Sequence, residues 1–247
     1  MFPIRDHNPS ERVPYVVYGL IAANIIAFLI GLPHMESERA MLAFWRDWAM
    51  IPAAVTQGGE LHGVVTSMFL HAGFMHLAGN MLFLWIFGDN LEDQLGHLGF
   101  LIFYLVAGIA AGLSHIIADP NSVIPTVGAS GAIGGVMGAY LLLFPKAKVD
   151  ILLIFIIFFR VFTIPAFVML GLWFAMQIFS GLSTPTEGGG VAYWAHAGGF
   201  IAGILMTVPV WLRRGAKAYW QRTEGHPPHP EIDYAPSNVP IVRRRRK

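Results

Sequence analysis

Residues 125–140 read PTVGASGAIGGVMGAY, a polar turn that continues directly into an apolar segment. Glycines at positions 131, 134, 135 and 138 have the i, i+3, i+4 and i+7 spacing of one helix face. Such a stripe of small residues lets a second membrane helix approach to near backbone contact. Ser130 lies in the first turn, where free backbone N–H groups and the helix dipole stabilise a developing negative charge. The stretch therefore predicts a tightly packed membrane helix with a reactive hydroxyl in its first turn.

The composition indicates an integral membrane protein. Of the 247 residues, 55% are hydrophobic and 13% are charged, whereas a soluble domain carries about 25% charged residues. The chain has no cysteine, which excludes disulfides, thiolate metal sites and a cysteine nucleophile. We expect no cofactor, no metal site and no nucleic-acid partner.

The apolar runs predict six membrane spans, at about 13–32, 69–87, 98–117, 126–144, 165–182 and 191–212. The run 149–182 is too long for one simple span, so we divide it at Pro165 and expect an interfacial segment before it. The chain then has an N-terminal segment (1–12), a membrane core (13–212) and a basic, proline-rich tail (213–247), which we expect to be disordered.

The distribution of lysine and arginine predicts the orientation of the spans. If both termini lie on one side, 14 of the 16 cations lie on that side, and only Arg39 and Arg46 lie on the other. We therefore expect both termini in the cytoplasm. Spans two, four and six then start at the outer face.

Four polar side chains lie inside these spans, where ionisable and amide groups are costly and usually functional. Ser130 and His196 lie about four and five residues into their spans, roughly 6–8 Å deep at 1.5 Å per residue. His76 lies about seven residues into its span, and Asn80 shares its helix face. We expect the four groups to reach one layer of the membrane.

These groups predict a serine hydrolase site. A neutral His196 is a suitable general base for the Ser130 hydroxyl, and glycines of span six allow the necessary close helix crossing: Gly198, Gly199 and Gly203. The Ser130 backbone N–H, the Asn80 amide and the His76 ring N–H can donate to an oxyanion. Because the acids nearest the membrane, Asp89, Glu92 and Asp150, are expected on the cytoplasmic side, the pattern favours a Ser130/His196 dyad over a triad.

The motifs GASG (128–131), TSMFLHAGFMH (66–76), HxxxN (His76 to Asn80) and AHAGG (195–199) resemble those of rhomboid intramembrane serine proteases. Over residues 13–212, the resemblance implies an all-α, six-span bundle with Ser130 as nucleophile, His196 as base and His76 and Asn80 as oxyanion-binding residues. It further implies transmembrane protein substrates, a lipid environment in a bacterial inner (plasma) membrane, and a structural role for Glu92. It leaves the oligomeric state open.

Two positions depart from the family pattern. Many rhomboids have a Trp-Arg pair nine residues before His71, where this chain has His62-Gly63. Some members have a tyrosine against the catalytic histidine, four residues after the nucleophile, where this chain has Gly134. Another group must therefore orient His196.

Span five is bulky and lacks a stripe of small residues, so we expect it to be the loosest wall of the bundle. A substrate would enter beside it while the loop 183–190 lifts. Trp173 and Phe174 are candidate gate residues, with ordinary packing as the alternative role for each.

Two other functions are compatible with parts of this pattern. One is a catalytically inactive rhomboid-like protein that binds membrane clients, which the presence of both Ser130 and His196 disfavours. The other is a haem or metal protein, whose candidate ligands lie at mixed depths: His71, His76, His97, His115 and His196. The absence of an HExxH motif also disfavours it.

Overall fold

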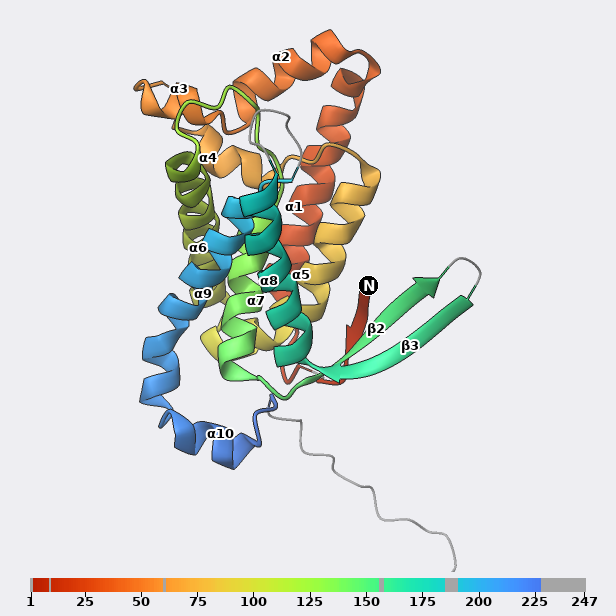
Figure 1. Ribbon diagram of the computed structural model, residues 1–247, viewed down its shortest axis with the longest axis vertical. Coiled ribbons are helices and arrows are strands. Elements are labelled where there is room, and N and C mark those ends of the chain that lie inside the picture. The colour runs from red at the N-terminus through yellow and green to blue at the C-terminus, as the bar shows by residue number, and fades with distance from the viewer. Residues whose placement is uncertain (1, 9, 60, 156–157, 185–190, 228–247) are drawn as a thin grey trace, which may run out of the picture.

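The computed structural model describes residues 2–8, 10–59, 61–155, 158–184 and 191–227, which form a helical bundle with a small sheet at one end (Figure 1). The long helices are α1 (Tyr15–Gly31), α5 (Phe74–Leu95), α6 (His97–Ala118), α7 (Ser130–Leu143), α8 (Ala166–Ser183) and α9 (Tyr193–Arg213). The short ones are η1 (Leu32–Glu36), α2 (Glu38–Trp48), α3 (Pro52–Thr56), α4 (Gly63–Thr66), η2 (Ser67–Phe69) and α10 (Lys217–Thr223). The mostly helical, polytopic membrane fold is thus confirmed.

Four helical segments are long and apolar enough to cross a membrane: α1 with η1, α6, α8 and α9. A fifth candidate consists of α4–η2 and α5, which are bent by 92° at a short break. The remaining apolar helix, α7, has only 14 residues, whereas a full span needs about 20. The described residues therefore give four or five spans, and the expected count of six stays a prediction that depends on α7.

Two helices begin later than the expected spans. Helix α5 starts at Phe74 instead of position 69, because the chain turns through residues 70–73. Helix α7 starts at Ser130 instead of position 126, because Thr126 forms a β-bridge with Met50 and the Gly128 N–H donates to the Ser67 carbonyl. His76 is consequently the third residue of its helix. Apolarity alone did not reveal these turns, since their residues are as apolar as the helices.

The centre of the bundle is α7, which is buried at every position from Gly131 to Tyr140. A Cβ atom added at Gly199 of α9 would lie 2.0 Å from the Gly131 carbonyl oxygen, and one at Gly203 would lie 2.0 Å from that of Gly135. These distances mean that α7 and α9 are in backbone contact, as the stripe of small residues led us to expect.

One glycine of α9 has a different neighbour from the expected one. A Cβ atom at Gly198 would lie 2.1 Å from Ser114 Oγ, so Gly198 packs against α6 and does not contribute to the contact with α7. The glycine stripe of α7 also meets α6, because a Cβ atom at Gly135 would lie 2.5 Å from Ala107 Cβ as well as 3.2 Å from the Gly199 carbonyl oxygen. Helices α6 and α9 therefore both pack against the glycine stripe of α7.

The interfacial segment expected before span five is a β-hairpin. Strand β1 (Phe2–Asp6) pairs with β2 (Lys148–Phe155), which pairs with β3 (Phe158–Pro165), all antiparallel. The hairpin projects from the lower end of the bundle in Figure 1. Its nearly continuous apolar run is compatible with both an interfacial helix and a strand, and pairing with the N-terminal strand is not visible from local sequence.

A buried carboxylate joins these three strands. Asp150 is 3% exposed and accepts hydrogen bonds from the Thr163 hydroxyl (2.5 Å) and Arg5 Nε (2.7 Å). His7 Nε2 lies 2.8 Å from Asp150 Oδ1, the same oxygen that the Thr163 hydroxyl contacts. The Thr163 hydroxyl, together with His7 and Arg5, holds the pKa of Asp150 well below its usual range.

Glu92 has the structural role that the resemblance implied. Its buried carboxylate accepts the backbone N–H groups of Val16 and Val17, each at 2.9 Å, and so caps the N-terminus of α1. The His97 ring contacts the same carboxylate, with Nδ1 2.5 Å from Oε1. Glu92 thereby ties the start of α1 to the end of α5.

The C-terminal segment begins with regular structure, since α10 lies within the tail that we expected to be disordered. Burial raises the pKa of Tyr219 in this helix. Residues 228–247 lie outside the described residues, and the division of the chain at position 213 stays a prediction.

Candidate active site

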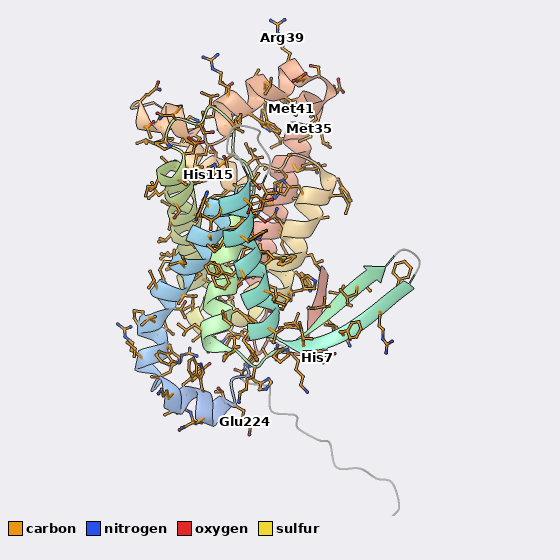
Figure 2. All side chains as sticks on the ribbon, in the orientation of Figure 1. His7, Met35, Arg39, Met41, His115 and Glu224 are labelled. Atoms are coloured by element: carbon orange, nitrogen blue, oxygen red, sulfur yellow. The ribbon has the colours of Figure 1, made fainter. Side chains whose placement is uncertain are left out.

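A cavity of about 800 Å³ is lined by residues of α5, α7, α8 and α9, and all four expected polar side chains line it: His76, Asn80, Ser130 and His196. His115 lines it too, and Figure 2 shows this residue in the upper part of the bundle, far from His7 near the sheet. The cavity therefore lies in the half of the bundle that carries α2, α3 and α4.

Ser130 and His196 are brought together by the first turns of two helices. Ser130 is the first residue of α7, and His196 is the fourth residue of α9. Ser130 Oγ lies 2.8 Å from His196 Nε2, which is hydrogen-bond distance. The contact of Gly199 with Gly131, one turn further along, fixes this approach.

Gln177 of α8 is a polar residue of the site that sequence reasoning missed. Its Oε1 lies 2.8 Å from His196 Nδ1, and its Nε2 donates to the Trp173 carbonyl at 3.3 Å. The side chain is buried, with 8% exposure. A sequence signal was available, because an amide inside an apolar span is costly and usually has a function.

The two candidate gate residues pack against α9. The Trp173 ring lies 5.9 Å from the His196 ring at an interplanar angle of 31°, so α8 supplies an aromatic neighbour that Gly134 cannot. The Phe174 ring stacks on Phe200 at 4.8 Å. Both rings pack against the hydrophobic core, and Trp173 also lines the cavity.

A small space between His76 and Ser130 is kept open by glycine. A Cβ atom at Gly128 would lie 2.9 Å from His76 Nε2 and 3.4 Å from Ser130 Oγ. Gly128 has φ +133°, a region that favours glycine. The Ala72 N–H approaches His76 Nδ1 at 3.4 Å, a long contact that favours the tautomer with its proton on Nε2. His76 can then donate into this space.

Asn80 lies one turn further along α5 and is 7% exposed. Its Nδ2 donates to the His76 carbonyl oxygen at 2.9 Å. An amide nitrogen carries two hydrogens, so a second one is available for another acceptor. The pair thus forms one polar patch on the cavity wall.

His71, another histidine of the sequence analysis, is not among the residues that line the cavity. The His71 ring is 2% exposed and lies 5.0 Å from the His76 ring, edge to face, behind the cavity wall. Among the described residues, no group of three or more His, Cys, Asp or Glu side chains is arranged to hold a metal ion. Most of the loop 183–190, which we expect to lift when a substrate enters, lies outside the described residues.

Comparison with known proteins identifies the family. Residues 58–213 match the Rhomboid domain. The Saccharomyces cerevisiae "Rhomboid protein 1, mitochondrial" is 36% identical over 149 residues, which cover 58% of this chain and 40% of that protein.

Two proteins of Bacillus subtilis are also similar. "Putative rhomboid protease YdcA" is 32% identical over 128 residues (52% of this chain, 61% of that protein). "Rhomboid protease GluP" is 35% identical over 133 residues (52% of this chain, 24% of that protein). The matched part thus spans less than two thirds of each of these relatives. They come from mitochondria and from a bacterium, so they support an integral membrane protein without favouring the bacterial inner membrane. The chain belongs to the rhomboid family.

Proposed function

We propose that the protein is an intramembrane serine endopeptidase in which Ser130 is the nucleophile and His196 the general base. The observation that carries the proposal is the 2.8 Å distance between Ser130 Oγ and His196 Nε2 at the wall of a cavity in a membrane bundle. A serine hydroxyl is a weak nucleophile unless an adjacent base takes its proton, and this geometry supplies that base. Two of the similar bacterial proteins carry the word protease in their names.

The proposed reaction uses the two side chains in turn. Ser130 Oγ attacks the scissile carbonyl carbon while its proton passes to His196 Nε2. The tetrahedral intermediate then breaks its C–N bond, and His196 gives the proton to the leaving amine. Water deprotonated by His196 hydrolyses the remaining acyl-enzyme and restores Ser130.

The substrates of this proposal are membrane proteins with a single transmembrane segment, cut in or near the bilayer where their helix is destabilised. We also propose that both termini of the chain lie in the cytoplasm. In the six-span arrangement 14 of the 16 lysine and arginine residues lie on the side of the termini, and cytoplasmic segments of membrane proteins are enriched in these residues. The cavity would then open toward the opposite face of the membrane.

The experiment that tests the function is cleavage of single-span substrates in proteoliposomes. We expect two fragments whose new termini lie in or near the transmembrane segment. An inactive client-binding protein would instead co-purify with intact substrate and yield no fragments, and that result would refute the proposed function.

We propose further that His76 and Asn80 hold the oxyanion, in the space that Gly128 keeps open. Replacing either residue by alanine should lower kcat by about 10² or more, since each well-placed donor contributes about 3 kcal/mol of transition-state stabilisation. The measurement is kcat on a transmembrane substrate, with thermal unfolding as the control for folding. Full kcat in both single variants would leave the oxyanion to backbone donors alone.

Substrate access beside α8 is the remaining part of this proposal. Few of the described residues of α8 are buried: Ala166, Met169, Leu170 and Gln177. Large apolar side chains on the same helix are exposed to lipid, including Phe167 (52%) and Phe179 (71%). A helix with so little buried surface costs less to displace than α7, which is enclosed on all sides.

Phe174 is the cleaner residue for testing this gate, because Trp173 also contacts the His196 ring. Phe174→Ala removes the stacking on Phe200, so cleavage of a transmembrane substrate should rise several-fold relative to that of a short soluble peptide. Only the transmembrane substrate needs α8 to move. Equal effects on both substrates would mean that α8 is a fixed wall.

A further inference from the structure

Gln177 has an unusual position for a polar side chain, because it lies on α8, the least enclosed wall, and yet contacts His196. The orientation of its amide follows from its two partners. The Trp173 carbonyl can only accept, so the amide nitrogen must face it at 3.3 Å. Oε1 therefore faces His196 Nδ1 at 2.8 Å.

This contact determines the tautomer of the imidazole. Because Oε1 can only accept, Nδ1 must carry the ring proton, which leaves Nε2 with a free lone pair toward Ser130 Oγ. The opposite tautomer would present an N–H to Oγ and could not take its proton. An asparagine has the corresponding place in Cys-His-Asn proteases. A neutral amide also costs less inside a membrane than a carboxylate does.

The location of the amide on α8 ties this orientation to the position of the helix. At 2.8 Å the bond is near its optimum, and an outward shift of α8 by about 1 Å would lengthen it beyond the usual limit of about 3.2 Å. The same shift would draw the Trp173 ring away from His196. Opening the wall for a substrate therefore releases the imidazole.

We propose that Gln177 is the positioning residue of the dyad and that it makes Ser130 reactive only while α8 is closed against α9. The inference rests on the proposed function of Ser130 and His196. It gives the open enzyme a low reactivity toward water and toward partly inserted segments. Reactivity returns when α8 closes on a correctly seated substrate.

The first test separates hydrogen bonding from packing. Gln177→Leu keeps most of the volume but removes the acceptor, so kcat on a short soluble peptide should fall about 10- to 100-fold with little change in KM. Met176→Leu is the matched control, since Met176 is the preceding residue and is 51% exposed toward lipid. It should keep wild-type kcat.

The second test is a pH profile. Gln177→Glu retains an acceptor and should recover most of the lost kcat, while the acid limb of kcat/KM moves to higher pH. The reason is that a carboxylate beside the ring favours protonated imidazole, which cannot act as a base. The other titratable groups around His196 are His76 from α5 and His115 from α6, with Asp119 at the cavity wall, and the variant leaves them unchanged. A merely structural role for Gln177 would not move the acid limb.

The third test closes α8 covalently. A Cβ atom at Gly181 would lie 3.4 Å from Tyr193 Cβ, close to disulfide geometry, and the chain has no other cysteine. The oxidised Gly181→Cys/Tyr193→Cys protein should label with a fluorophosphonate at the rate of its own reduced form. It should lose cleavage of a transmembrane substrate until it is reduced.

The outcomes distinguish a failure of this inference from a failure of the proposed function on which it rests. If wild-type Ser130 does not react with the fluorophosphonate, the proposed function fails. If Ser130 reacts but Gln177→Leu keeps its kcat and Gln177→Glu keeps its acid limb, only the positioning role fails. If oxidation of the cysteine pair abolishes labelling, closed α8 is not the reactive state and the coupling is wrong.

Discussion

Ser130→Ala and His196→Ala should each abolish cleavage of a transmembrane substrate, with losses of roughly 10⁴ to 10⁶ in kcat. Members of one catalytic unit fail together, because the hydroxyl is unreactive without its base and the base has no role without the hydroxyl. The measurement is the initial rate of fragment formation in detergent. The double variant should be no worse than either single variant.

A suitable control shows that these losses are chemical. Ser114→Ala removes a hydroxyl that packs against Gly198 and donates to the Ala110 carbonyl of its own helix, and it should keep activity within a few-fold of wild type. Thermal unfolding of all variants should be similar. Activity of either Ser130→Ala or His196→Ala within tenfold of wild type would rule out the dyad.

Gly199→Leu should lower kcat by about 10² or more and should also lower the unfolding temperature. The new side chain would start 2.0 Å from the Gly131 carbonyl oxygen, so α7 and α9 must separate. His196 is on the same turn as Gly199, and a displacement of about 1 Å between reacting groups can cost about 10² in rate.

The matched control for this substitution is Gly19→Leu on α1. A Cβ atom there would meet nothing within 4 Å, so both the unfolding temperature and kcat should change little. If Gly199→Leu kept the wild-type unfolding temperature and rate, the contact of α7 with α9 would not be what aligns Ser130 with His196.

Much of the fold could be predicted from the sequence because membrane helices follow from apolar length. Helix α6 runs from His97 to Ala118, within one residue of the expected 98–117. The starts of α5 and α7 could not be predicted in the same way, because a β-bridge between Thr126 and Met50 decides where α7 begins. Such long-range pairing leaves no local signal in an apolar stretch.

Part of the candidate site could also be predicted, because polar residues stand out in apolar spans. Ser130, His196, His76 and Asn80 are isolated polar residues in apolar spans, and all four line the cavity. Gln177 has the same signal but was not predicted, because the third member of a serine–histidine site is usually a carboxylate and not an amide. The hairpin of β2 and β3 was not predicted because residues 151–159 are one continuous apolar run without a glycine, proline or asparagine to indicate a turn.

The most direct test of the account is the mapping of a fluorophosphonate adduct by mass spectrometry on the full-length protein in lipid. We predict a single modified residue, Ser130, with labelling lost in His196→Ala because the base that activates the hydroxyl is gone. Labelling at a different serine, or undiminished labelling of Ser130 in His196→Ala, would contradict the proposed dyad.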